Sequence, residues 1–583
     1  MANLVSPGYK ENKLINSILV PYEEKIVEFK GMNRRNQKDE GEMYDMLNLT
    51  LDDYPLLSPR KLRGEYVLPE GVVKPLQVIS RRDRIAMLAT DENEDVYFYY
   101  DGNKINTVTG LTTSSRMVAI NTKICFFPDK TYIEIFPSGA SYTIGDFGSL
   151  EATSTVSALA VTISNEDARI TLPADHGYKY DDALNINGTL SYTSGGIAST
   201  KDCVVSCVIE DVVNDNTLVL PRETFIELTG EGASSITLTG TISRTMPDLD
   251  HIIEWNNRLW GASNEDNTIY ACKLGDPTNW QYFQGTSLDS YYAQQGTDGQ
   301  WSGVAAYSGH IIFFKPDGMC RIYGTAPSNY QVTNAKCYGV EDGSRLSVVT
   351  INDVVYYKSM VGIMAYSGGT PVCISEKLGD NFANVVAGSE GQKYYASIQR
   401  TGQDGGFSLI VFDINKGMWV KEDSLRMRGC CVLDNRLHAI VHDTSELLCG
   451  DDIYVDPYLV GTDSNTEGSV VIVNPVDPEE KYEELSWMAQ FGPFHEYAEN
   501  KKIYSKLSLR LKANGKSNVK VYIALDEGAW ELIKEYRLAE TGGAVIPIIP
   551  RRCDRYSIKV EGKGNCEIIS LTRRARAGTF GRL

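Results

Sequence analysis

One short pattern recurs along the middle of the chain and constrains its fold more than any other feature. A polar turn leads into a short apolar strand, a charged hairpin follows, and a second apolar strand ends the unit. Clear copies begin at Lys123, His310 and Asp353, and weaker copies begin at Arg258 and Arg436. Most copies lie about 40–50 residues apart, which is the period of four-stranded β-propeller blades.

This repeat predicts an all-β fold with a β-propeller at its centre. One four-stranded sheet cannot bury both of its faces, whereas sheets stacked around an axis bury them and a closed ring protects the strand edges. The chain has 583 residues, of which 42% are hydrophobic, so it can bury such a core. We expect about six or seven blades between residues 70 and 455, with the ring closed by a strand from one terminus paired to the last blade.

The pattern is interrupted once and fades before the sequence ends. Residues 148–246 break the period and are rich in Thr, Ser and Val, which predicts a small β-barrel or sandwich inserted between two blades. Beyond the Gly/Asp/Pro-rich stretch 461–480, alternating segments such as 507–511 predict a second β-sandwich. The expected parts are an extended arm (1–65), a first propeller segment (66–147), the inserted domain (148–246), a second propeller segment (247–455), a linker (456–484) and a C-terminal β-sandwich with a basic tail (485–583).

The charge balance disfavours two classes of partner. There are 57 Lys and Arg against 76 Asp and Glu, a formal net charge of −19. An acidic surface repels nucleic acid and anionic membranes, because binding to them relies on clustered Lys and Arg. The acidic surface therefore serves to avoid DNA or to meet a basic partner, or it only keeps the protein in solution.

Basic residues gather near the C-terminus. Residues 551–583 hold nine basic and three acidic side chains, a net charge of +6. Charge asymmetry of this kind is typical of a tail that docks on an acidic neighbour, such as another copy of the chain, or of a solvated tail. The candidate interface residues are Arg551, Arg552, Arg573, Arg574 and Arg576, together with Arg34 and Arg35 of the arm.

Cysteine usage and the N-terminal sequence bear on the compartment. The 12 cysteines are scattered and include no C-x-x-C motif, which indicates reduced thiols and assembly in a cytosol. We see no signal peptide, and no stretch approaches the length of a membrane span.

Three segments resemble catalytic or metal-binding motifs but lack residues that these motifs require. The segment 515–517 ends like a P-loop but lacks the first phosphate-cradling glycine, so a hairpin turn explains it better. Residues 91–95 begin like an EF-hand loop, but Val96 replaces the required glycine, which leaves a solvated or weakly cation-attracting turn. His438 and His442 have zincin spacing without the intervening Glu. We therefore predict no catalytic residue, no cofactor and no metal ion.

One segment is more specific than the rest of the chain. The signature residues within 256–280 are Asn257, Arg258, Leu259, Trp260, Gly261, Gly275, Asp276, Pro277 and Trp280. Elementary turn chemistry predicts an inward strand over Arg258–Trp260 with Gly261 at a turn, and a tight turn at Gly275–Pro277.

This signature resembles the blade sequence of the tail nozzle, or tail hub, proteins of short-tailed phages, also called packaged-DNA stabilisation proteins. The arm segments 42–49 and 52–60 resemble N-terminal segments of related phage proteins, and the likeness spans about residues 40–420. It does not extend to the inserted domain or the C-terminal domain.

The resemblance implies a structural virion protein of the phage tail, assembled in the host cytoplasm, and not an enzyme. Nozzle proteins form homo-oligomeric rings, commonly hexamers, below the portal and its adaptor. They line the channel through which double-stranded DNA passes without specific binding, and they help to retain and release the genome. An acidic channel wall would let DNA slide.

Two other functions stay open from the sequence. The chain could be a tail adsorption or fibre-attachment protein that binds a receptor or partner, which exposed tyrosine clusters on blade loops would favour. It could also be a propeller glycosidase, which two carboxylates converging in a central cleft would favour.

Overall fold

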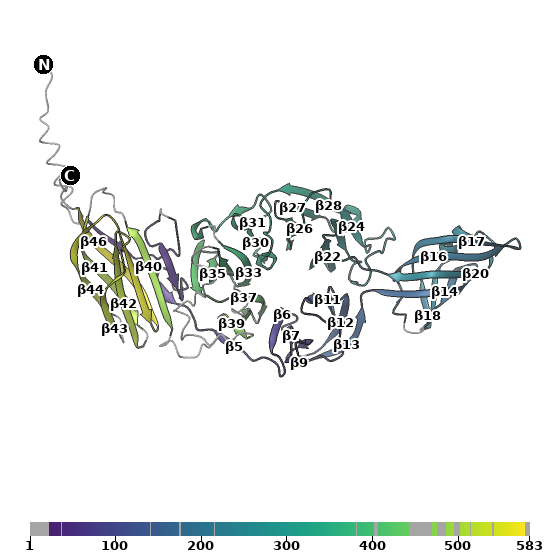
Figure 1. Cartoon of the computed structure of the whole chain (residues 1–583), viewed down its shortest axis with the longest axis horizontal. Coiled ribbons are helices and arrows are strands. Elements are labelled where there is room, and N and C mark those ends of the chain that lie inside the picture. Colours follow the sequence, from purple (N-terminus) through teal and green to yellow (C-terminus); the bar gives the residue numbers. More distant parts are fainter. Residues whose placement is uncertain are drawn as a thin grey trace, which may run out of the picture. The chain divides into compact units, whose positions relative to one another are not determined.

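The computed structural model confirms an all-β fold that contains a β-propeller, an inserted β domain and a C-terminal β-sandwich (Figure 1). It describes residues 22–35, 38–139, 141–173, 176–214, 216–379, 382–401, 406–441, 469–474, 485–494, 502–513, 515–538 and 542–577. These residues form two compact units. The first unit contains 69–355 and 367–371, and the second contains the described parts of 1–68, 356–366 and 372–583.

Four propeller blades belong to the first unit. Each is a four-stranded antiparallel meander whose strands pair in sequence order. Blade 1 has β6 (Lys74–Ser80), β7 (Ile85–Thr90), β8 (Val96–Tyr100) and β9 (Asn103–Lys104), and blade 2 has β10 (Arg116–Ile120), β11 (Lys123–Phe127), β12 (Thr131–Ser138) and β13 (Ser141–Ser149). Blade 3 has β21 (His251–Trp255), β22 (Arg258–Ser263), β23 (Thr268–Ala271) and β24 (Tyr291–Gln294), and blade 4 has β25 (Gly303–Tyr307), β26 (His310–Lys315), β27 (Gly318–Tyr323) and β28 (Gln331–Lys336).

The cores of this unit lie between consecutive blades. Phe126 of β11 packs in a cluster with blade 1 residues, whereas its neighbour Cys125 packs in a cluster with Leu259 of blade 3. Trp260, next to Leu259, packs in turn with Phe313 of blade 4. Because successive strand residues point to opposite faces, a continuously apolar strand buries both faces of its sheet. This explains the near-continuous apolar runs seen in the sequence.

The insertion between blades 2 and 3 is a small β domain. Seven strands form one sheet in the order β17-β16-β20-β14-β15-β19-β18. They are β14 (Ala152–Ile163), β15 (Asp167–Thr171), β16 (Ala183–Ser194), β17 (Ile197–Val208), β18 (Asp211–Asn214), β19 (Thr217–Pro221) and β20 (Ser234–Arg244), joined by the short helix α2 (Glu223–Thr229). Figure 1 shows β14, β20, β16 and β17 side by side in this domain. The sequence did not predict α2, which buries Phe225 in the domain core.

A fifth four-stranded sheet, blade 5, follows blade 4 along the chain. It contains β29 (Val349–Ile351), β30 (Val354–Ser359), β31 (Gly362–Tyr366) and β32 (Val372–Cys373). Three short 3-10 helices occur near blades 4 to 6, namely η1 (Pro327–Asn329), η2 (Arg345–Ser347) and η3 (Glu376–Leu378).

The second unit holds two further blades, which brings the described four-stranded blades to seven. Blade 6 has β33 (Phe382–Glu390), β34 (Lys393–Arg400), β35 (Gly406–Asp413) and β36 (Met418–Asp423). Blade 7 has β37 (Met427–Leu433), β38 (Arg436–Val441), β39 (Val470–Ile472) and β5 (Gly64–Tyr66). The strand donated from the N-terminal side is therefore β5, which pairs with β39. We expected a linker over 456–484, but β39 lies within it, so that boundary was wrong.

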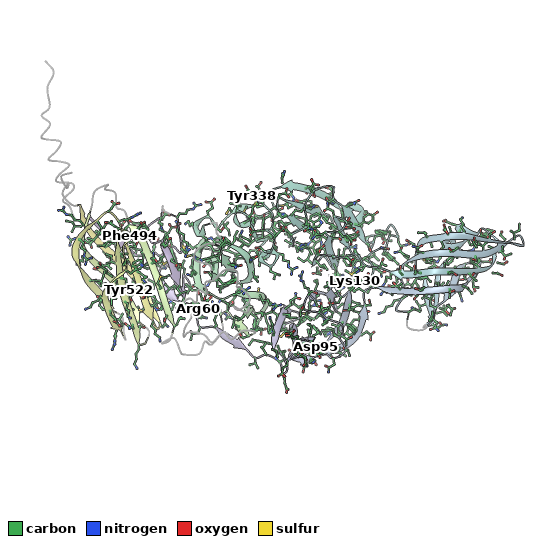
Figure 2. The ribbon with its side chains drawn as sticks, viewed as in Figure 1. Arg60, Asp95, Lys130, Tyr338, Phe494 and Tyr522 are labelled. Atoms are coloured by element: carbon green, nitrogen blue, oxygen red, sulfur yellow. The ribbon has the colours of Figure 1, made fainter. Side chains whose placement is uncertain are left out.

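A buried charge cluster fixes the arm just before β5. Arg63 donates hydrogen bonds to Glu422 at 2.8 Å and to Asp423 at 2.7 Å, and its side chain is 1% exposed. Arg60, labelled in Figure 2, also pairs with Asp423 at 3.1 Å. Both carboxylates belong to the end of blade 6, so the arm is held where it enters blade 7.

The C-terminal domain is a sandwich of two sheets, β1-β46-β41-β44 and β2-β40-β45-β42-β43. The arm donates one strand to each sheet, β1 (Tyr22–Ile26) and β2 (Met43–Leu47), and adds the hairpin β3 (Leu49–Thr50) and β4 (Ser58–Pro59). The other strands are β40 (Ser486–Phe494), β41 (Lys502–Ala513), β42 (Ser517–Leu525), β43 (Glu531–Leu538), β44 (Gly542–Cys553), β45 (Tyr556–Lys563) and β46 (Cys566–Ala577). The arm thus packs across other elements and also completes the sandwich.

Candidate functional site

The signature segment surrounds a buried arginine. Arg258, at the start of β22, is 1% exposed. Its guanidinium donates hydrogen bonds to the carbonyl oxygens of Cys272 at 2.7 Å, Ser287 at 2.8 Å and Asp289 at 2.6 Å. Carbonyl oxygens thereby satisfy the buried donors, and Arg258 fixes the long loop between β23 and β24 from inside.

A tight turn begins this loop, as the sequence predicted. Gly275 has φ +76°, and its N–H donates to the carbonyl of Asn257 at 2.7 Å. Asp276 accepts from the N–H and the hydroxyl of Thr278, and the Trp280 indole N–H donates to Pro277 at 2.7 Å. The signature residues therefore build and hold a single loop.

The prediction that Gly261 lies at a turn was wrong. It lies inside β22 and not at a turn. A Cβ atom at this position would lie 2.6 Å from Cδ1 of Leu249 and 3.1 Å from the carbonyl oxygen of His251. Close packing of Leu249 therefore requires glycine here.

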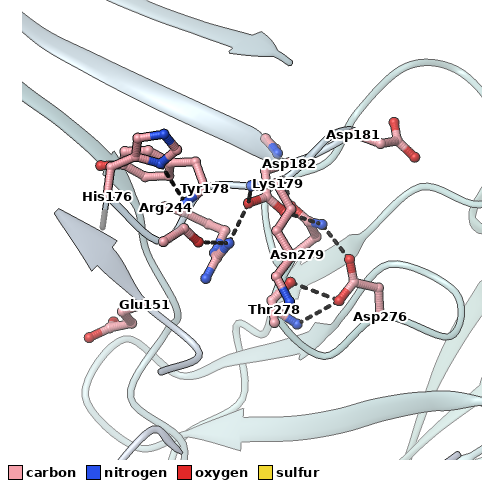
Figure 3. A network of polar contacts seen from close by, with 12 residues as sticks. Glu151, His176, Tyr178, Lys179, Asp181, Asp182, Arg244, Asp276, Thr278 and Asn279 are labelled. Atoms are coloured by element: carbon pink, nitrogen blue, oxygen red, sulfur yellow. Dashed lines mark hydrogen bonds and ion pairs between the residues drawn. The ribbon is translucent and has the colours of Figure 1, made fainter. Parts of the chain in front are cut away.

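The same loop carries the inserted domain through a buried polar joint (Figure 3). Asn279 is 1% exposed, and its side-chain oxygen accepts the N–H of Ala183 at 2.8 Å. Its amide nitrogen donates to Asp182 at 3.3 Å and to Asp276 at 2.5 Å. Asp182 pairs in turn with Arg244 at the end of β20. We call Asp182, Arg244, Asp276 and Asn279 the joint.

Further contacts close around the joint. Arg244 donates to the carbonyls of Gly177 at 3.2 Å and Ser149 at 3.3 Å, and Lys273 pairs with Asp181. Lys130, labelled in Figure 2 at the root of the inserted domain, lies 2.8 Å from both Glu151 and Asp248. These two carboxylates belong to the two chain connections of the insertion, so both are tied to blade 2.

The joint perturbs its own titrating groups. Burial raises the pKa of Asp182, and the Arg244 guanidinium only partly offsets this. Burial lowers the pKa of Lys130, but hydrogen bonds to Asp248 and Glu151 outweigh it and raise the pKa overall. Burial raises the pKa of the nearby Cys272 thiol to about 12, which keeps it protonated. None of the described cysteines forms a disulfide bond.

The loop beyond the joint presents exposed apolar side chains. Asp289 accepts the backbone N–H groups of Gln284, Gly285 and Thr286 at 2.8–3.0 Å. Within and beside this fixed loop, Phe283 is 49% exposed and stacks edge to face with Tyr292, which is 61% exposed. Large exposed aromatic side chains on a preorganised loop are typical of interfaces.

The described residues of the predicted basic tail, up to 577, lie mostly in strands. Arg551 and Arg552 lie in β44, and Arg573, Arg574 and Arg576 lie in β46. Arg573 is 6% exposed, pairs with Glu24 of β1 and lies 3.7 Å from the ring centroid of Phe494. An acidic partner from the arm compensates the charge, so Arg573 acts inside the chain.

The other candidate arginines differ in exposure. Arg551 is half exposed and pairs with Glu531 at 2.7 Å. Arg34 pairs with Asp45 at 3.2 Å within the arm, and the exposed Arg35 pairs with Glu376 at 2.5 Å. Their assignment to an intermolecular interface stays a prediction.

The segments that resemble catalytic or metal-binding motifs lie in ordinary strands and turns. Gly515, with φ +106°, lies in the turn between β41 and β42, and residues 91–95 form the turn between β7 and β8. His438 is 5% exposed in β38 and contacts the Tyr66 ring edge to face, whereas His442 lies outside the described residues. Among the described residues, no group of three or more His, Cys, Asp or Glu could hold a metal ion. Within the same part of the chain, no helix has the length and apolar character needed to cross a membrane.

Comparison with solved structures gives matches only at very low identity and low TM-score. No family model and no curated protein matches the chain. A solved exo-beta-1,3-galactanase of Phanerochaete chrysosporium is 10% identical, with 55% of this chain and 95% of that chain covered and a TM-score of 0.21. Hsv2 of Kluyveromyces lactis is 13% identical, with 60% and 99% covered and a TM-score of 0.25. PorZ of Porphyromonas gingivalis is 11% identical, with 86% and 82% covered and a TM-score of 0.21.

The residues of the joint outside the signature could not be found from the sequence. Asp182 and Arg244 lie in the inserted domain, far from Asn279 in sequence, and each is one of many charged residues. The only local signal was the Asp–Asp pair at 181–182 before an apolar strand, which also fits a common turn.

Proposed function

We propose that the chain is a structural component of a phage tail, a nozzle or hub ring below the portal and its adaptor. In this role it lines the DNA channel and helps to retain and release the genome. The observation that carries the proposal is the joint. The segment that resembles nozzle proteins is the segment that holds an additional β domain by buried polar contacts.

Rigid attachment of parts suits an assembly component. The Asp182–Arg244 pair is almost fully buried, and separating it would leave charges without partners at a cost of about 3–5 kcal/mol. In the second unit, the arm completes both sheets of the sandwich and one propeller blade. Each part is therefore fixed by contacts that would resist mechanical load during genome passage.

The acidic composition supports a DNA channel that does not bind its contents. With a net charge of −19, an oligomer would repel DNA and let it slide. Micromolar affinity for duplex DNA at physiological salt would speak against this part of the proposal.

A direct test is co-sedimentation of the purified full chain with a purified portal–adaptor assembly. Stable, stoichiometric binding is expected, and the exposed Arg551→Glu variant should weaken it if the basic strands contribute. The matched reversal Arg169→Glu, on an exposed arginine of the inserted domain, should not weaken it. Failure of the unmodified chain to bind would contradict placement below the adaptor.

A second candidate is favoured by the exposed aromatic loop. Phe283 and Tyr292 are the kind of side chains that an adsorption or fibre-attachment protein presents to a partner. Phe283→Ser should then abolish binding to a fibre protein while leaving binding to the portal–adaptor assembly intact.

A further inference from the structure

A cavity of about 450 Å³ opens on the first unit, away from the joint. Its volume falls in the usual range for small-molecule sites, about 300–1,000 Å³. The turn of blade 1 supplies Arg82, Asp83 and Arg84, and the hairpin of blade 2 supplies Pro137 and Tyr142.

The polar side of the cavity is held in place by its backbone. Arg82 and Asp83 have φ values of +51° and +57°, which makes a tight turn between β6 and β7. Arg84 pairs with Asp101, itself at φ +51° in the next turn of the blade. The Arg84–Asp101 pair is therefore held before any ligand arrives, which lowers the entropic cost of binding.

Tyr142 in the hairpin of blade 2 is also held in place, with the Arg84 guanidinium over its ring, 5.1 Å from the centroid. The Tyr142 hydroxyl donates to the carbonyl of Tyr100 at 3.2 Å and accepts from Asn103 at 3.0 Å. The Tyr100 ring meets the Tyr142 ring edge to face, with centroids 4.8 Å apart. Ile135 and Pro137 also line the cavity.

The charges of the lining select the class of ligand. Two arginines, Arg82 and Arg84, stand beside two aspartates, Asp83 and Asp101, so the site has no net charge. Such a lining offers no advantage to an anion or a cation. It offers many donors and acceptors to a ligand that carries both on each group, as a hydroxyl does.

We propose that this cavity binds a neutral saccharide. Arg82 and Asp83 hydrogen-bond neighbouring sugar hydroxyls, and the apolar C–H face of the sugar packs against Ile135 and Pro137. This inference does not depend on the proposed place of the chain in a tail.

The test is ligand-observed saturation-transfer NMR on the full chain. The probes are lactose, maltose, cellobiose and N,N′-diacetylchitobiose, with N-acetylneuraminic acid and inorganic phosphate as anionic comparisons. Binding of at least one neutral disaccharide is expected, without binding of the two anions.

The diagnostic variant is Asp83→Asn. Asparagine tolerates positive φ, so the turn is kept while the carboxylate is lost. Affinity should fall about fivefold or more, the effect of one lost charge-assisted hydrogen bond. The matched control is Asp353→Asn, because Asp353 is also exposed and has φ +56° in the equivalent turn between β29 and β30, outside the cavity.

Three results would overturn the proposal. In the first, none of the four disaccharides binds. In the second, the anions bind and the disaccharides do not. In the third, Asp83→Asn and Asp353→Asn lose the same amount of affinity for the disaccharide. Circular dichroism of both variants separates a local loss of contacts from unfolding.

Discussion

The side-chain oxygen of Asn279 accepts a hydrogen bond from the backbone N–H of Ala183, 2.8 Å away. Asn279 belongs to the loop of blade 3, and Ala183 begins β16 of the inserted domain. One amide side chain therefore joins two domains and also separates the carboxylates of Asp182 and Asp276.

Replacing Asn279 with Asp should loosen the joint. The substitution keeps the shape but removes the N–H₂ donors and places a third carboxyl between two others. Leaving buried acceptors unpaired costs about 1–3 kcal/mol each, and more for charged groups, so the inserted domain should become mobile. Hydrogen exchange at Ala183 and Leu184 should accelerate, whereas the exposed-site control Asn93→Asp should leave it unchanged. Unchanged exchange in Asn279→Asp would show that the joint does not hold the domain.

The charge cluster beside β5 should be costly to break. Arg63→Met would leave Glu422 buried without its cation and Asp423 with Arg60 alone, and such a loss destabilises by about 3–5 kcal/mol. The matched control is Arg35→Met, which removes the exposed pair with Glu376 and should cost about 0–1 kcal/mol. Calorimetric unfolding of the two variants compares them directly. Equal midpoints would contradict a role for Arg63 in holding the arm.

Gly261→Ala should destabilise blade 3 by overpacking. The added methyl group would lie 2.6 Å from Leu249, and such crowding costs about 1–3 kcal/mol. Since the nearest atom is the end of a side chain, the second substitution Leu249→Ala should restore part of the loss. Gly296→Ala is the control, because a Cβ there meets nothing within 4 Å. The unfolding temperature measures all three variants.

The fold should lose stability in mild acid through His310. Burial, aided by Arg321, lowers the pKa of His310 from 6.5 to about 4. Between these values the unfolded chain binds a proton that the folded chain does not, so stability is present above pH 6.5 and falls as the pH approaches 4. A difference of this size corresponds to about 3 kcal/mol. In His310→Gln, the pH dependence of urea unfolding should flatten over this interval. An unchanged pH profile would show that other groups control the acid response.

Much of the fold could be predicted because its signals are local. The blades alternate apolar strands with turns such as Asp101–Gly102 and Pro128–Asp129, and every blade strand except β5 pairs with a sequence neighbour. Period-two alternation and turn chemistry therefore specify both the strands and their partners.

What the sequence did not reveal depends on contacts between distant residues. The strand β5 has three residues, and its partner β39 lies about 400 positions away along the chain, in a stretch that resembles a linker. The strands β1 and β2 look like irregular polar sequence because their partners are in the C-terminal domain. Likewise, the sequence alone indicates that Arg573 belongs to a charged tail, because its partner Glu24 lies far away along the chain.

Only part of the candidate site could be predicted from the sequence. Turn chemistry predicted the Gly275–Pro277 turn, but it did not predict that Arg258 would fix the loop or that Asn279 would carry another domain. Both roles depend on burial, which the sequence does not specify for polar residues.

The central claim, that the chain is a ring-forming tail component, is tested most directly by its mass in solution together with negative-stain images. The account predicts a closed homo-oligomer, a hexamer in the first instance, with a central hole of roughly 20 Å or more, wide enough for a DNA duplex. A chain that stays monomeric both alone and in the presence of the portal–adaptor assembly would contradict it.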